Sequence, residues 1–192
     1  MRVVYLSASG RLGGAERGHE LFLQALARIP AASPIRAYVI GGPIYQTDAS
    51  QYSIDELKNH ARRAGLAGRV GFTGFVEDAA AAMRALDIVV HASTAPEPFG
   101  LVVAEAMACG RAVVMSPASG AAEHVEPDHD VLVFPAADVD ALARRIRELA
   151  GDDDLRHRLG KAARATAERR FDRARMSQAV IALYESIMVR RA

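Results

Sequence analysis

The sequence lacks the features that mark disulfide scaffolds, membrane-spanning chains and disordered chains. It has one cysteine, Cys109, among 192 residues, so neither an internal disulfide framework nor a four-cysteine zinc site can form. No apolar run approaches the roughly 18–20 residues that span a bilayer. Hydrophobic residues make up 51% of the chain and charged residues 24%, which excludes a disordered composition.

A large excess of charge of one sign is also lacking. Lys and Arg number 24 and Asp and Glu 23, a formal charge of +1, which argues against non-specific nucleic-acid binding as the main task. The apolar stretch near the N-terminus is too short for the hydrophobic region of a secretory signal. We therefore expect a cytoplasmic protein with no transmembrane segment and no nucleic-acid partner.

Short apolar runs rich in β-branched residues alternate with longer helical stretches. Continuous apolar runs are typical of strands that are buried on both faces of a parallel sheet. The alternation predicts right-handed crossovers and an α/β fold: a single Rossmann-like, doubly wound parallel sheet of about six strands. The expected strands are Val3–Ser7, Ile35–Ile40, Val70–Phe72, Ile88–His91, Ala112–Met115 and Val131–Phe134.

The helical stretches carry their own start and stop signals. Ser53 and Glu56 have the spacing of a capping box, and Gly65 fits the end of the same helix. Strand candidates cease near residue 137, so residues 138–192 are expected to form C-terminal helices. Six arginines are most simply the solvated face of those helices: Arg169, Arg170, Arg173, Arg175, Arg190 and Arg191. We expect one domain over residues 1–192.

A glycine-rich loop follows the first expected strand. Ligands of such sheets bind outside the carboxyl ends of the strands, and this loop carries Arg11 and Arg17 among four glycines. Glycines let backbone amides approach an anion, and arginine forks match phosphate oxygens. His19 and Glu20 stand where a Walker loop needs Lys and Ser/Thr, and the strict dinucleotide fingerprint is absent. A turn without a ligand explains this loop equally well.

The segment Glu97–Gly110 carries the strongest signal. Pro98 cannot lie deep within a helix, so the helix should begin near Gly100, with its first amides free at the sheet edge. Glu105, one turn into the helix, could accept hydrogen bonds from sugar hydroxyls, and Glu97 could face the same ligand. Alternatively, both glutamates stabilise the helix dipole by about 0.3–1 kcal/mol each. That alternative suits Glu105 poorly, because an apolar helix should be buried and a buried, unpaired carboxylate is costly.

Three further groups of residues are candidates. After Gly74, Phe75 and Val76 could form an apolar wall for a flat base, or could belong to the core. The run Asp152–Asp154 is more simply a helix N-cap than a metal site. Three histidines lack metal-ligand spacing, and no acidic partner is assigned to them: His91, His124 and His129.

The segments that carry these candidates resemble the group 1 (family 4) glycosyltransferases. The resemblance rests first on Glu97–Gly100 followed by Glu105–Gly110 and Ala112–Val114. It is supported by three further segments, Arg69–Phe75, Asp87–His91 and Val131–Pro135. Such enzymes retain anomeric configuration and have two Rossmann-like domains, the GT-B architecture. The match covers roughly residues 35–190 and resembles the second, donor-binding domain.

The resemblance implies a role for each candidate. Glu105 would bind the ribose hydroxyls, and Glu97 would contact the donor sugar near the reacting centre. Arg11 and Arg17 would stabilise the negative charge on the departing diphosphate, although lysine is usual where Arg17 stands. The donor is a nucleotide sugar, and no metal or other cofactor is expected. The diphosphate or sugar would lie on the amides of Phe99, Gly100, Leu101 and Val102, and the base beside Gly74, Phe75 and Val76.

The resemblance also predicts that the family's usual first domain is missing. Residues 1–30 could be the proper opening of the second domain, which we favour, or a first-domain beginning joined to it. We therefore expect a donor-binding domain that binds a nucleotide sugar for hexosyl transfer to an acceptor hydroxyl, and that transfers little when isolated. The alternatives are a sugar-nucleotide epimerase, for which acid–base residues are not evident, and a non-catalytic interaction module. Such a module would pair with a first-domain partner or form a homodimer through the uncovered face.

Overall fold

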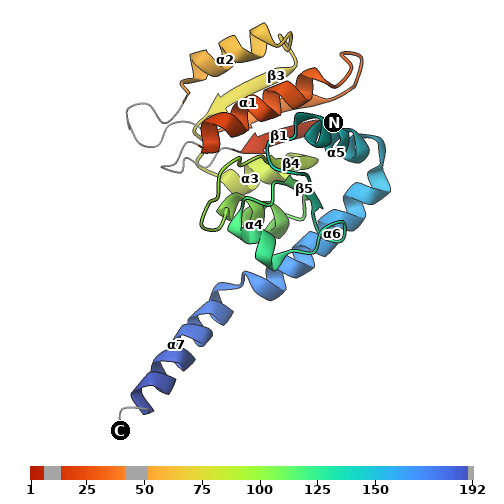
Figure 1. The fold of residues 1–192 in the computed structure, drawn as a ribbon. Coiled ribbons are helices and arrows are strands. Elements are labelled where there is room, and N and C mark those ends of the chain that lie inside the picture. Colours follow the sequence, from red (N-terminus) through yellow and green to blue (C-terminus); the bar gives the residue numbers. More distant parts are fainter. Residues whose placement is uncertain (7–13, 42–51, 190–192) are drawn as a thin grey trace.

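The protein folds around one parallel sheet with helices on both faces (Figure 1). The structure is a computed structural model that describes residues 1–6, 14–41 and 52–189. The six strands run in the order β3-β2-β1-β4-β5-β6, and every pair is parallel. Their bounds are β1 Arg2–Leu6, β2 Arg36–Ile40, β3 Val70–Gly74, β4 Ile88–His91, β5 Ala112–Met115 and β6 Leu132–Val133.

The strands form where the apolar runs predicted them. All residues of β4 and β5 are buried, as expected of central strands that are covered on both faces. The sixth strand is only two residues long, although its neighbours Val131 and Phe134 are fully buried as well. The strand order reverses between β1 and β4, which confirms the doubly wound arrangement.

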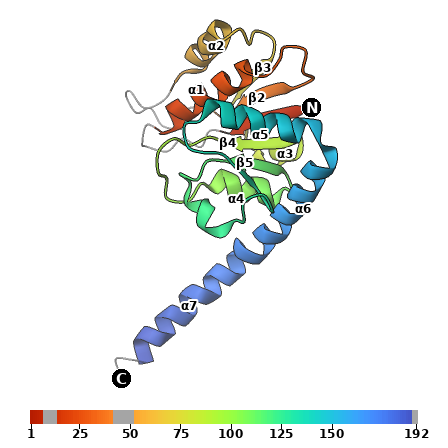
Figure 2. The same cartoon turned by 45° about the vertical axis from the view of Figure 1, so that its right-hand side comes forward.

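Two hydrophobic layers hold the helices on the sheet. One layer joins the sheet to α1, α2 and α5, and the other joins it to α3 and α4. The helix α6 contributes to both, because Leu155 and Leu159 pack in the first layer and Ala163 and Ala167 in the second. Figure 2 shows α6 passing the end of the sheet at which β5 begins, where Gly160 lies beside Gly110. The bounds are α1 Gly14–Ala27, α2 Ile54–Arg63, α3 Ala79–Arg84, α4 Leu101–Ala108, α5 Val139–Gly151, α6 Asp153–Arg170 and α7 Arg173–Val189, with a 3-10 helix, η1, at Gly120–His124.

Local hydrogen bonds fix the helix ends as the sequence predicted. Ser53 and Glu56 form a reciprocal capping box at α2, and Gly65 follows the helix with φ +72°. The carboxylate of Asp152 accepts from the Leu155 amide at 2.8 Å. Asp152 is therefore the N-cap of α6, as its position at a helix start indicated.

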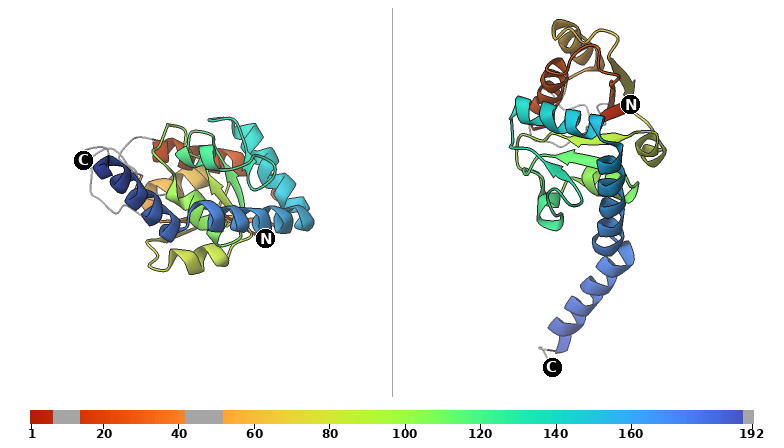
Figure 3. Two further views of the ribbon diagram at one scale, coloured as in Figure 1. Left: turned by 90° about the horizontal axis from the view of Figure 1, so that it is seen from below. Right: turned by 90° about the vertical axis from the view of Figure 1, so that its right-hand side faces the viewer.

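The last helix, α7, extends beyond the sheet and the other helices (Figure 3, right). Of the arginines predicted to be solvated, the four that the structure describes are exposed, namely Arg169, Arg170, Arg173 and Arg175. The apolar residues of α7 that mark its helical period are exposed as well. None of the helices within the described ranges is both long and apolar enough to cross a membrane. The exposed apolar residues of α7 are Met176, Val180, Ile181, Leu183, Tyr184, Ile187 and Met188.

Candidate functional site

The candidate site lies where the loop before α4 meets the loop after β5. The amide of Glu97 donates to the carbonyl of Ala118 at 3.1 Å, and the amide of Gly120 donates to the carbonyl of Glu97 at 3.2 Å. The hydroxyl of Ser119 donates to the carbonyl of Phe99 at 2.7 Å. These bonds hold the Glu97 loop beside the carboxyl ends of β4 and β5.

Glycine is required at the turn into α4. Gly100 has φ +85°, in the left-handed region that residues with a Cβ rarely adopt. A Cβ built there would lie 2.3 Å from the Ser119 hydroxyl and 2.5 Å from Glu97 Oε1. The absence of a side chain at Gly100 therefore lets Ser119 and Glu97 approach the start of the helix.

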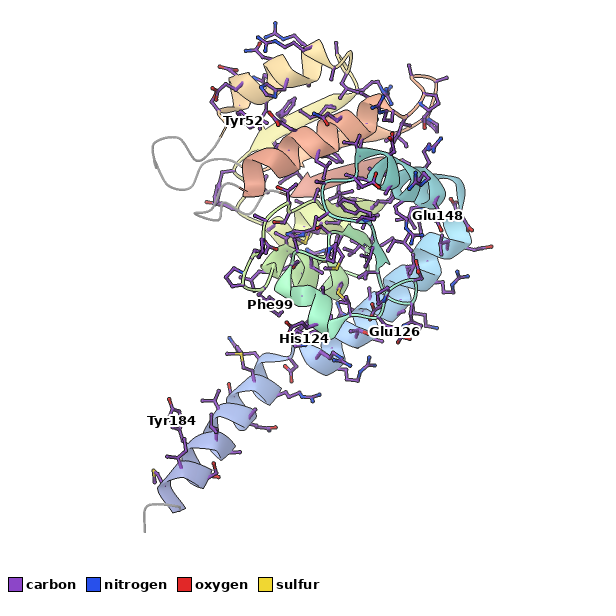
Figure 4. The ribbon with its side chains drawn as sticks, in the orientation of Figure 1. Tyr52, Phe99, His124, Glu126, Glu148 and Tyr184 are labelled. Atoms are coloured by element: carbon purple, nitrogen blue, oxygen red, sulfur yellow. The ribbon has the colours of Figure 1, made fainter. Side chains whose placement is uncertain are left out.

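Four consecutive backbone amides at the start of α4 are free of hydrogen bonds within the described residues. They belong to Phe99, Gly100, Leu101 and Val102, and the first bonded amide is that of Val103. The Phe99 ring packs instead against His124 and Phe171, with ring centroids 5.9 and 5.6 Å away. Figure 4 shows Phe99 and His124 close together. The amides of this turn are thus available to an anionic ligand.

Glu97 contacts a buried histidine, His91. The prediction that assigned no acidic partner is therefore wrong for His91, and it is also wrong for His129, whose Nδ1 lies 3.7 Å from Glu126 Oε2. His91 Nε2 lies 2.7 Å from Glu97 Oε1, a buried oxygen that has no other partner within the described residues. Burial alone would raise the pKa of Glu97. The attraction of His91 and the nearby Ser119 hydroxyl together outweigh burial and lower the pKa of Glu97 below its usual value. Glu97 is therefore held ionised.

Glu105 is exposed, and the expectation of a wholly buried helix is wrong for one stripe of α4. Leu101, Glu105 and Ala108 face outward at spacings of three and four, while Val103 and Met107 pack inward. No side chain in the described part of the chain pairs with the Glu105 carboxylate. Partial desolvation raises the pKa of Glu105, so its charge is disfavoured by its surroundings.

The third predicted segment ends β3. Gly74 closes the strand with φ +70°, and the helix α3 begins five residues later with Asp78 as its N-cap. Phe75 is 68% exposed, so it is no core aromatic, whereas Val76 is half-buried and packs against the second hydrophobic layer. The interpretation of Phe75 as part of the core is therefore wrong.

The side chains of both arginines of the first loop lie outside the described residues. Arg11 lies outside the described residues, and Arg17 falls in the first turn of α1 with its side chain outside them. The structure adds two residues that the sequence did not indicate as partners of Glu97, namely His91 and Ser119. The sequence could not predict either contact, because each one joins residues that lie in separate loops or strands.

Comparison with known proteins identifies relatives of the chain. Residues 5–166 match the family described as glycosyl transferases group 1. The phosphatidyl-myo-inositol mannosyltransferase of Mycolicibacterium smegmatis is 34% identical over 182 residues, which are 93% of this chain and 44% of the relative. A lipopolysaccharide core biosynthesis glycosyltransferase of Rhizobium meliloti, LpsE, is 28% identical over 170 residues. The aligned residues are 88% of this chain and 46% of the relative. The chain thus spans about half the length of these curated relatives.

Solved structures show the same fold. HepE from Anabaena, in complex with UDP-glucose, superposes with a TM-score of 0.83 at 32% identity and covers 96% of this chain and 48% of its own. A C-terminal domain of a group 1 glycosyl transferase, LpcC from Francisella tularensis, superposes with a TM-score of 0.72 at 26% identity. That match covers 90% of this chain and 87% of the solved domain.

Proposed function

The chain belongs to the group 1 glycosyltransferases, and on this premise we propose that it binds the nucleotide sugar from which a hexosyl group is transferred to an acceptor hydroxyl. The observation that carries the proposal is the start of α4. Four free amides lie there, between an ionised Glu97 and an unpaired Glu105. A diphosphate matches the amides, and hydroxyl groups match the carboxylates. That HepE was solved with UDP-glucose supports this ligand class.

In the proposed site each residue has a separate role. The diphosphate accepts hydrogen bonds from the amides of residues 99–102, and Glu105 accepts from the ribose hydroxyls. Glu97 contacts the donor sugar, while Phe75 and Val76 lie beside the base. Arg11 and Arg17 neutralise charge on the leaving diphosphate, so we expect no metal ion to be needed.

We propose transfer with retention of configuration. The acceptor oxygen forms a bond to the anomeric carbon on the side from which the diphosphate departs, as the bond from that carbon to the diphosphate oxygen breaks. The proton of the acceptor hydroxyl passes to the departing diphosphate. Because the chain spans about half of its relatives, we expect this stretch alone to bind the donor and to transfer little sugar.

Titration calorimetry with UDP, GDP and ADP tests the proposed function. We expect one of the three to bind, and Glu105→Ala to abolish that binding because the ribose loses its acceptor. Glu185→Ala is the matched control, since it removes an exposed helical carboxylate on α7, away from the site. No heat with any of the three nucleotides, or unchanged binding by Glu105→Ala, would contradict the proposal.

The alternative function, a non-catalytic interaction module, draws on α7. Its apolar side chains, Tyr184 among them, project from the helix into solvent (Figure 4). Such exposure is typical of a surface that packs against another polypeptide. Light scattering that finds a dimer, combined with no nucleotide binding, would favour this alternative over donor binding.

A further inference from the structure

A buried imidazole lies behind the candidate site. His91 ends β4 and is 5% exposed, and its carbonyl accepts the Ser116 amide at 3.0 Å, so its backbone is fixed by the sheet. Its Nε2 contacts Glu97, whereas Nδ1 has no hydrogen-bond partner in the described residues. A buried polar atom without a partner costs stability, and an apolar side chain would avoid that cost. Packing alone therefore does not explain a histidine at this position.

The contact with Glu97 does explain it. A glutamate in a loop has three rotatable side-chain bonds, and these must be ordered before its carboxylate can meet a ligand in one orientation. The Glu97 oxygen Oε1 lies 2.7 Å from His91 Nε2 and beside the backbone of Gly100, and Ser119 is a further neighbour of the carboxylate. Oε1 itself is buried, but the Glu97 side chain as a whole is 29% exposed, so a ligand can reach the part of the ordered side chain that Oε1 does not occupy.

We propose that His91 is a positioning residue for Glu97, which it orders before the donor binds by attracting Oε1 through Nε2. The inference rests on the proposed function, in which Glu97 contacts the donor sugar. The attraction requires the ring proton on Nε2 and leaves Nδ1 as an acceptor in the neutral ring. Ordering the carboxylate in advance lowers the entropic cost of binding the sugar, and it leaves the nucleotide contacts unchanged.

The prediction is a selective loss of sugar recognition. His91→Ala should weaken the binding of UDP-glucose or GDP-mannose, whichever the wild-type chain binds, by about 10-fold relative to free UDP or GDP. The affinity for the free nucleotide should stay unchanged. His91→Gln should restore most of the difference, because the Gln amide nitrogen can occupy the position of Nε2 and donate to Oε1.

A control variant separates positioning from packing. Val89 lies on the same strand and the same face of the sheet as His91, and it is fully buried in the layer beneath α4. Val89→Ala should lower the unfolding temperature without changing the affinity ratio between nucleotide sugar and nucleotide. Titration calorimetry on the wild type and the three variants gives that ratio, and thermal unfolding identifies the variants that fold.

The outcomes are distinguishable. An unchanged ratio in a folded His91→Ala variant, or an equal loss in Val89→Ala, would overturn the positioning role and leave donor binding intact. A ratio that falls in His91→Gln as far as in His91→Ala would overturn it too. A wild-type chain that binds neither nucleotides nor nucleotide sugars would overturn the proposed function and this inference together.

Discussion

Replacing Gly100 by alanine tests how tightly the candidate site is built. The variant adds one methyl group where the backbone is left-handed and where two polar atoms lie within 2.5 Å of the new carbon. One of them, the Ser119 hydroxyl, is bonded to the Phe99 carbonyl and cannot leave without losing that bond. The other, Glu97 Oε1, would have to move away from His91.

Two terms set the expected size of the effect. A left-handed residue with a Cβ costs about 1–2 kcal/mol relative to glycine. Overpacking a filled site adds about 1–3 kcal/mol. Gly65→Ala is the matched control, because Gly65 has φ +72° but no atom lies within 4 Å of its built Cβ. Gly65→Ala should therefore lower the free energy of unfolding by the backbone term alone, and Gly100→Ala should lower it by both terms.

Chemical denaturation gives the two free energies of unfolding, and thermal unfolding should show the difference as about 2–4 °C per kcal/mol for a chain of this size. The double variant Gly100→Ala, Ser119→Ala should recover part of the second term, because the 2.3 Å contact disappears. Equal losses of unfolding free energy in Gly100→Ala and Gly65→Ala would show that Ser119 and Glu97 do not crowd position 100. That result would refute the geometry described for the candidate site.

Two further predictions concern Glu105 and the cap of α2. The pKa of Glu105 is higher in the folded protein than in the unfolded chain, because its surroundings disfavour the ionised form. The protonated side chain therefore stabilises the folded state below the pKa of the unfolded chain, and that part of the free energy of unfolding is lost as the pH rises through the raised pKa. Glu105→Gln should therefore raise the urea midpoint at pH 7 and change it little at pH 4, and a lowered midpoint at pH 7 would refute this. Ser53→Ala should cost about 1 kcal/mol in urea unfolding, because it removes the acceptor for the Glu56 amide. No loss would show that the capping box does not stabilise the fold.

The fold could be predicted from the sequence because its strands are apolar on both faces. A continuous run such as Ile88–His91 indicates a strand that is buried on both faces, and the predicted strand bounds agree with the structure to within one or two residues. The strand at the edge of the sheet is shorter than predicted, because β6 forms over only two residues of the apolar run Val131–Phe134. The 3-10 helix η1 was not predicted, since its short turn carries no helical period.

The candidate site was predicted only in part, because its contacts join elements that are distant along the chain. Sequence spacing located the start of α4 and both glutamates, but it could not show that Glu97 points to His91 and Ser119. The prediction that Glu105 is buried is wrong for a different reason. Apolar residues, Leu101 and Ala108, also occupy the outward face of α4, so the sequence shows no amphipathic pattern there and predicts burial for a stripe that is exposed.

The helix α4 shows how one element can hold both the core and a polar site. Its inward residues Val103 and Met107 are fully buried and fix the helix on the sheet, so the four free amides at its start are held in place. Its outward stripe carries Glu105, a carboxylate whose surroundings disfavour its charge and that has no partner among the described residues. Nothing in the folding of this helix requires a charge there, since glutamine has nearly the same helix propensity. We infer, in line with the proposed function, that a ligand which donates hydrogen bonds to the carboxylate accounts for the glutamate. If so, Glu105→Gln should gain stability and lose nucleotide affinity together.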